Sequence, residues 1–123
     1  MKIAVWGVGP HAIKNILPAI WETDGLELSG VLTRNSKVRK YCEKTYNCVA
    51  WNSSKEMLED MTIDVVYSCS PIELHYSQGL STLKSGKHFW SEKSFTSSLE
   101  QTTELVNFSI EKNLTLAEGF MYV

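Results

Sequence analysis

The sequence predicts an α/β protein whose parallel sheet is doubly wound, with helices on both faces in a three-layer αβα arrangement. Six short apolar runs of strand length alternate along the 123 residues with segments whose apolar residues recur at helical spacing. No internal repeat, low-complexity segment or Pro/Gly-rich linker interrupts this alternation. Strands that alternate with helices pair in parallel, and right-handed crossovers distribute the helices over both faces. We therefore expect one domain, residues 1–123, with one hydrophobic core.

The first half of the chain carries three strand patterns separated by helical ones. The predicted elements, in order, are a strand at 2–6, a helix over 13–20, a strand at 26–33, a helix around 38–42 and a brief strand at 48–51. Pro18 lies inside the first helix and removes one backbone N–H, so we expect a kink or a tightened turn there.

The second half continues the alternation and adds capping signals. Its predicted elements are a short helix through 57–58, a strand at 63–69, a helix over 74–83, a strand at 87–91, a helix over 105–110 and a strand at 114–117. Ser53 with Glu56, and Ser98 with Gln101, form capping boxes that open the two outer helices. Gly86 can end the helix over 74–83 in a left-handed cap. The run at 63–69 is rich in β-branched residues, which suits a strand covered on both faces.

The turn after the first strand, Gly7-Val8-Gly9-Pro10-His11-Ala12, has the pattern of a dinucleotide-binding turn. Gly7 permits a tight turn, Gly9 lets the backbone approach a pyrophosphate, and Ala12 allows the helix to pack closely on the sheet. The N–H groups of the helix start, including those near His11, can then bind phosphate charge. The pattern alone is weak, but its place at the first strand–helix junction predicts a Rossmann-type fold.

The residues after the second strand concern the choice of cofactor. An NAD-specific domain usually presents Asp or Glu there, whereas this chain has Thr33-Arg34-Asn35-Ser36. An arginine flanked by the hydroxyls of Thr33 and Ser36 can bind a 2′-phosphate, which favours NADP over NAD and leaves NAD open. The alternative is that Arg34 is a solvated surface charge. The missing carboxylate also counts against a methyltransferase.

Two further strand ends carry polar side chains that could face a ligand, since ligands bind beyond the carboxyl ends of such strands. Ser70, Pro71 and His75 follow the fourth strand. His75 either contacts a ligand or is satisfied by nearby backbone, and the second is commoner. Glu92 and Lys93 follow the fifth strand. Lys93 could stabilise an alkoxide at a substrate hydroxyl, or it is an ordinary surface lysine.

Composition excludes several classes of protein. A net charge of −2 without a basic stripe argues against a nucleic-acid partner. The chain reaches Gly7 at once and has no long apolar run, so we expect neither signal peptide nor membrane span and a cytoplasmic location. Cys42, Cys48 and Cys69 form no metal or redox pattern. We interpret them as buried thiols, with a reactive thiol at Cys69 as the alternative.

Five motifs in this order resemble the glucose-fructose oxidoreductase, inositol dehydrogenase and rhizopine-catabolism (Gfo/Idh/MocA) family along the whole chain. They are Gly7-x-Gly9-x-x-Ala12, Ser70-Pro71-x-x-Leu74-His75, Ser85-Gly86-Lys87-His88, Glu92-Lys93 and Glu118-Gly119-Phe120-Met121-Tyr122.

The resemblance implies an NAD(P)-dependent oxidoreductase that transfers hydride between the nicotinamide and a sugar-like or cyclic polyol. It places the hydroxyl-activating role on Lys93 and puts Glu92 beside the nicotinamide, while Ser70, Pro71 and His75 line the cofactor site.

The chain departs from the family pattern in two ways. Ser94 stands where the family has proline after the glutamate–lysine pair, and the family's C-terminal substrate domain has no counterpart in these 123 residues. We therefore expect a domain that is catalytically incomplete by itself. The alternatives are a non-catalytic dinucleotide-binding or redox-sensing module, and an inactive remnant. A face left uncovered by the missing domain could also make the chain a homodimer.

Overall fold

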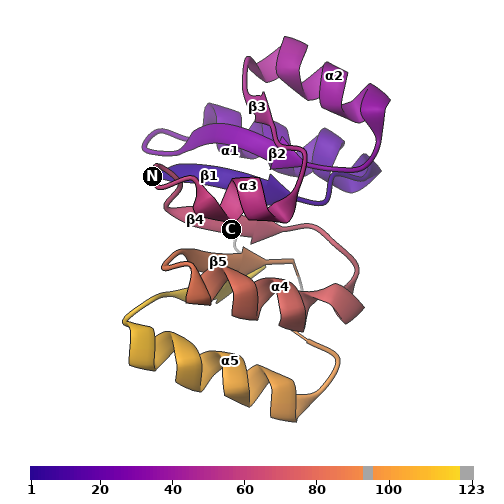
Figure 1. The fold of residues 1–123 in the computed structure, drawn as a ribbon. Coiled ribbons are helices and arrows are strands. Elements are labelled where there is room, and N and C mark those ends of the chain that lie inside the picture. The colour runs from indigo at the N-terminus through magenta and orange to yellow at the C-terminus, as the bar shows by residue number, and fades with distance from the viewer. Residues whose placement is uncertain (93–95, 120–123) are drawn as a thin grey trace.

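The sheet has the predicted parallel, doubly wound topology. The computed structural model describes residues 1–92 and 96–119, and in them six strands pair in the order β3-β2-β1-β4-β5-β6, every pair parallel. The strands are β1 Lys2–Trp6, β2 Glu27–Leu32, β3 Val49–Ala50, β4 Val65–Ser68, β5 His88–Ser91 and β6 Leu116–Glu118. Figure 1 shows them stacked from β3 downward. The strand order reverses between β1 and β4, where such folds bind ligands.

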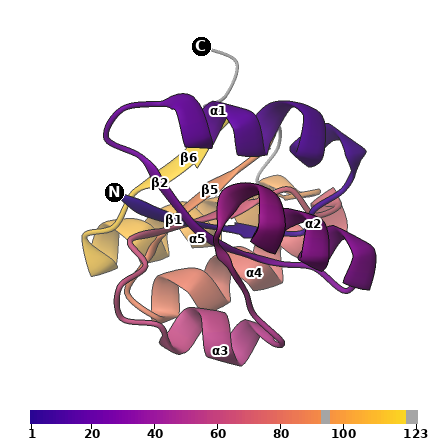
Figure 2. The same cartoon turned by 90° about the horizontal axis from the view of Figure 1, so that it is seen from above.

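Helices cover both faces of the sheet, as the three-layer prediction requires. They are α1 Leu17–Glu22, preceded by the π-helical segment η1 Ala12–Ile16, then α2 Ser36–Tyr46, α3 Ser54–Glu59, α4 Ile72–Lys84 and α5 Leu99–Lys112. Figure 2 shows α1 on one side of the sheet and α3 and α4 on the other. The core clusters agree: α1 and α2 pack on one face, α3 on the opposite face of β1 and β4, and α4 and α5 against β5.

Alternation along the central strands produces these two core layers. In β1, Ile3 and Val5 pack toward α1 while Ala4 packs with Met57 of α3. All four residues of β4 are buried. This confirms the interpretation of the β-branched run as a strand covered on both faces, because an edge or one-sided strand would expose alternate side chains.

The predicted helix ends are present. Ser53 Oγ accepts from the N–H of Glu56 at 3.2 Å, and Ser98 Oγ accepts from that of Gln101 at 3.1 Å. Gly86 follows α4 with φ +81°. Sequence analysis did not anticipate that Asn35 caps α2, where its Oδ1 accepts from Lys37 and Val38 N–H groups at 3.0 and 3.1 Å.

The helix that contains Pro18 differs from the expectation of a kink inside it. The chain forms the wider π turn over Ala12–Ile16 before the proline, and Pro18 falls in the first turn of α1. A first-turn proline is tolerated because the N–H at that place often has no partner within the helix. The change of helix type therefore accommodates the missing donor.

Candidate functional site

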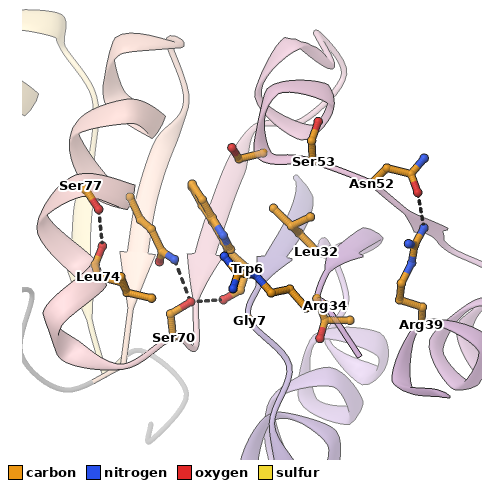
Figure 3. Close-up of a pocket in the computed structure, with 13 residues that line it drawn as sticks. Trp6, Gly7, Leu32, Arg34, Arg39, Asn52, Ser53, Ser70, Leu74 and Ser77 are labelled. Atoms are coloured by element: carbon orange, nitrogen blue, oxygen red, sulfur yellow. Dashed lines mark hydrogen bonds between the residues drawn. The ribbon is translucent and has the colours of Figure 1, made fainter. Parts of the chain in front are cut away.

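A pocket of about 980 Å³ opens beyond the carboxyl ends of β1 to β4 (Figure 3). Its lining residues are Trp6, Gly7, Leu32, Thr33, Arg34, Arg39, Asn52, Ser53, Ser54, Ser70, Leu74, Ser77 and Gln78. Four of the predicted cofactor-binding residues are among them: Gly7, Thr33, Arg34 and Ser70. The pocket lies at the reversal of strand order, where the topology predicts a ligand.

The glycine-rich turn is held tightly against two neighbouring strands. Gly7 has φ +86°, and its N–H donates to the carbonyl of Leu32 at 2.8 Å. A Cβ built at Gly7 would lie 2.5 Å from Ser70 Oγ and 3.1 Å from Ser70 N. Glycine is therefore required here for the turn, as predicted, and also for the close approach of the loop after β4, which sequence alone did not reveal.

The rest of the turn has the properties that a phosphate-binding helix start needs. Gly9 is exposed, and a Cβ built on it would meet nothing within 4 Å, so its backbone is open to a ligand. Ala12 is 1% exposed and packs in the core beneath the turn. Pro10 and His11 are exposed at the helix start and lie outside the lining of the pocket.

His11 brings the glycine-rich turn next to the end of β5. Its Nε2 lies 3.2 Å from Oε1 of Glu92, whose side chain is 18% exposed, and its Nδ1 lies 3.1 Å from Nδ2 of Asn15. Glu92 follows β5 directly, and its N–H donates to the carbonyl of Ser68 at 3.3 Å. The structure thus brings together two predicted site residues that are far apart in the sequence.

The far end of the pocket carries positive charge. Arg34 is exposed in the lining, which also contains the half-buried Arg39, a residue that sequence analysis missed. Arg39 Nη2 donates to the carbonyl of Ala50 at 2.9 Å and to Asn52 Oδ1 at 2.8 Å. The lining residues include these two guanidinium groups and no carboxylate. Such a surface favours an anionic ligand group.

Only some of the nearby hydroxyl-bearing residues line the pocket. Thr33 lines the pocket, and its Oγ1 accepts from Asn35 N–H at 3.3 Å. Ser36 is the first residue of α2 and does not line the pocket. Ser53, which the sequence analysis assigned to a helix cap alone, and Ser54, the first residue of α3, add hydroxyls to the lining.

The three predicted residues after β4 lie in different surroundings. Ser70 lines the pocket, whereas Pro71 is exposed at the N-cap of α4. His75 is 1% exposed, and its Nε2 lies 2.8 Å from the carbonyl of Ser70. This contact with local backbone is the alternative that sequence analysis preferred. His75 therefore supports Ser70 from the interior.

Lys93, the predicted catalytic residue, lies outside the described residues, as do Ser94 and residues 120–122 of the last family motif. Its neighbour Glu92, which follows β5, is the last described residue before this gap. The catalytic role of Lys93 therefore stays a prediction.

The three cysteines are free thiols. Burial raises the pKa of Cys48 to about 11 and that of Cys69 further, with the charge of Glu92 adding to the rise at Cys69. A thiol with a raised pKa is a poor nucleophile at neutral pH, so the alternative of a reactive Cys69 is disfavoured.

Among the residues that the structure describes, no group of His, Cys, Asp or Glu side chains could hold a metal ion. No helix in these same stretches is long and apolar enough to cross a membrane.

Comparison with known proteins agrees with this geometry. The family model GFO_IDH_MocA, described as an oxidoreductase family with an NAD-binding Rossmann fold, matches residues 1–120. A dTDP-3,4-didehydro-2,6-dideoxy-alpha-D-glucose 3-reductase of Streptomyces violaceoruber is 30% identical over 123 residues, which are all of this chain and 36% of that protein. The D-glucoside 3-dehydrogenase of Escherichia coli K12 is 31% identical over 121 residues, covering 98% of this chain and 34% of that protein.

Solved structures show the same likeness. KijD10, a 3-ketoreductase from Actinomadura kijaniata crystallised with NADP and TDP-benzene, superposes with a TM-score of 0.93 at 26% identity. The match covers 99% of this chain and 38% of KijD10. The chain thus spans little more than a third of the length of the relatives it matches.

Proposed function

Because the chain belongs to the GFO_IDH_MocA family of oxidoreductases, as its NAD-binding Rossmann domain, we propose that it binds NADP in the pocket beyond β1 to β4. The bound nicotinamide would exchange hydride with a sugar-like or cyclic polyol substrate. The observation that carries the choice of NADP is the pair Arg34 and Arg39 in a lining without a carboxylate. A 2′-phosphate is the group that distinguishes NADP from NAD and needs such cations.

The pocket and the turn beside it fit the remaining parts of a dinucleotide. Gly9 offers open backbone at a helix start, where phosphate charge is favourable. Trp6, Leu32 and Leu74 supply apolar surface in the lining, and an adenosine needs such a surface. NADP in the crystal structure of KijD10 and the name of the Haloferax volcanii relative, D-xylose 1-dehydrogenase (NADP(+)) 2, support the same cofactor.

For the reaction, we assign the contact with the nicotinamide to Glu92 and the activation of the substrate hydroxyl to Lys93. The role of Glu92 is supported by its place at the end of β5, beside His11 of the glycine-rich turn. Lys93 is supported by the family motif and by its position next to Glu92. An ammonium at this place would stabilise the alkoxide that develops as hydride leaves its carbon.

The substrate class is supported by the relatives, whose names specify reductases and dehydrogenases of sugars. Since this chain spans 36% of the first of these proteins, we expect further substrate contacts from outside the domain. Ser70 and Pro71, which follow β4, complete the set of loop residues that we assign to the cofactor.

The proposal is tested by titrating the 123-residue chain with NADPH and with NADH while following nicotinamide fluorescence. We expect saturable binding with NADPH preferred, and we expect Arg34→Ala to weaken NADPH about tenfold while leaving NADH unchanged. Lys37→Ala, an exposed cation on the first turn of α2, is the matched control and should change neither affinity.

An equal response of both nucleotides to Arg34→Ala would contradict the role of Arg34. Absence of binding by either nucleotide would contradict the cofactor site in this chain. NADPH binding by the parent enzyme without turnover of any sugar or polyol would favour a non-catalytic dinucleotide-binding module.

A further inference from the structure

Gln78, a polar residue of α4, is buried at the inner wall of the pocket. It is 6% exposed, and both ends of its side-chain amide are used. Its Oε1 accepts from Ser68 Oγ at 2.6 Å, and its Nε2 donates to Ser70 Oγ at 2.9 Å. Ser68, the last residue of β4, is fully buried, so the amide joins a strand end to the loop that follows it.

The side-chain hydrogen bonds run from Ser68 through Gln78 and Ser70 to the carbonyl of Trp6, while the Ser70 backbone N–H donates back to Ser68 Oγ at 3.3 Å. Because Ser68 donates to the amide oxygen, the amide nitrogen faces Ser70 and donates to it. The hydroxyl of Ser70 then keeps its own proton for the carbonyl of Trp6, at 3.2 Å (Figure 3). Trp6 directly precedes Gly7, so the chain of donors ends on the peptide that leads into the glycine-rich turn.

The contact between Ser70 and Gly7 leaves little freedom at this point. A Cβ on Gly7 would come within 2.5 Å of Ser70 Oγ, so the two backbone segments already touch. The Ser70 hydroxyl thus lies against the Gly7 turn and shares the Trp6 carbonyl with the Cys69 N–H, which donates to it at 2.9 Å. Gln78 is the side chain that fixes this hydroxyl from within the protein.

We propose that Gln78 is a positioning residue that holds Ser70 against the Trp6–Gly7 turn and so keeps the nucleotide pocket in its binding shape before the cofactor arrives. The inference rests on the proposed function in that the ligand is NADP. Preorganisation of this kind raises affinity because the cofactor no longer has to order the turn.

The first test compares two substitutions one helical turn apart on α4. Gln78→Met keeps the length of the side chain and removes both hydrogen bonds. Thr82→Val is the matched control, since Thr82 is fully buried and its Oγ1 has no hydrogen-bond partner among the described residues. We expect Gln78→Met to weaken NADPH binding about tenfold and Thr82→Val to leave it unchanged. Wild-type affinity in Gln78→Met would overturn the proposal.

The second test separates positioning from stability. Gln78→Met leaves the buried hydroxyl of Ser68 without its acceptor, which destabilises the fold. Adding Ser68→Ala removes that hydroxyl, and with it the acceptor of the Ser70 N–H at 3.3 Å, so we expect the double variant to regain part of the lost thermal stability and not affinity. Recovery of both together would show that Gln78 acts only through stability and would overturn the proposal.

A double-mutant cycle with Ser70→Ala tests the route of the effect. If Gln78 acts through the Ser70 hydroxyl, Gln78→Met should cost no further affinity once Ser70 is alanine. Additive losses would overturn this route.

A measurement without nucleotide keeps the inference separate from the proposed function. Amide hydrogen exchange at Gly7, whose N–H donates to Leu32, should be faster in Gln78→Met than in wild type and unchanged in Thr82→Val. Unchanged exchange in Gln78→Met would overturn the inference. Failure of the wild-type chain to bind NADPH, with exchange altered as expected, would overturn the proposed function and leave the role of Gln78 in place.

Discussion

The imidazole Nε2 of His11 lies 3.2 Å from the carboxylate Oε1 of Glu92, so the glycine-rich turn after β1 and the end of β5 are in direct contact. One residue belongs to the dinucleotide-binding pattern and the other to the glutamate–lysine pair. Their contact brings the predicted phosphate-binding and catalytic segments to one edge of the sheet. The His11 side chain is half exposed, which limits the energy of the pair.

We expect His11 and Glu92 to be coupled weakly and electrostatically. A double-mutant cycle of His11→Ala and Glu92→Gln, measured by chemical denaturation, should give a coupling of about 0.5 kcal/mol at low salt. At a pH at which the imidazole is protonated, the coupling should decrease in 1 M salt because the half-exposed His11 is open to screening by ions. A coupling that is absent at low salt would contradict the contact.

The two glycines of the turn should respond differently to alanine. Gly7→Ala places a Cβ in the left-handed region and against Ser70, so we expect a loss of about 2–4 kcal/mol in the free energy of unfolding. Gly9→Ala meets nothing within 4 Å and has no positive φ, so stability should be unchanged or higher by about 0.5 kcal/mol.

Nucleotide titration of the same pair supplies the functional half of this prediction. Gly9→Ala should fold normally and still bind NADPH more weakly, because we propose that the phosphates approach the backbone at Gly9. If Gly9→Ala binds NADPH as tightly as wild type, the ligand does not approach the backbone at Gly9.

Arg39 should matter for both the pocket and the fold. Arg39→Lys keeps the charge but replaces the planar guanidinium, whose Nη2 donates to both Ala50 and Asn52, with a compact ammonium, so we expect NADPH to bind several-fold more weakly. The melting temperature should fall by a few degrees as well, since a charge-assisted hydrogen bond is worth about 1.5–3 kcal/mol. Affinity for NADPH equal to that of wild type would show that Arg39 serves only to anchor α2.

Stability should decline in alkaline solution because of the buried thiols. Burial raises the pKa of Cys42, Cys48 and Cys69 above the ordinary value of 9.0, so these thiols stay protonated in the folded chain after they have ionised in the unfolded one. The stability that they contribute is complete below pH 9 and is lost as pH rises above it, at about 1.4 kcal/mol per thiol and pH unit.

A buried lysine changes stability in the opposite direction over the same alkaline range. Burial lowers the pKa of Lys87, whose Nζ donates to the carbonyl of Asp60 at 2.8 Å, so its contribution to stability rises with pH. The gain from this one lysine is opposed by the losses from three thiols. Urea denaturation between pH 8 and pH 10 should therefore show a net decline, and Cys69→Ala should reduce its slope. A flat profile in the wild type would contradict the raised pKa values.

The strands and helices, the three layers and the glycine-rich turn were predictable because their signals are local. Apolar periodicity distinguished six strands from the helices between them, and residues such as Ser53 and Ser98 marked helix starts through contacts within one turn. The residues that follow each strand could be named as candidates because parallel strands all present their carboxyl ends at one edge. Gly7, Thr33, Arg34 and Ser70 were identified in this way.

Only the tertiary structure decided which side chains meet at that edge. Arg39 and Gln78 sit within helices, and whether a helical position faces a pocket depends on how its helix crosses the sheet, which sequence spacing does not specify. The same packing buries His75 behind Ser70 and sets His11 opposite Glu92. The sequence by itself therefore determined the fold and its binding edge, because these follow from local periodicity and topology. The contacts that shape the pocket join distant segments, and only the packed chain brings those together.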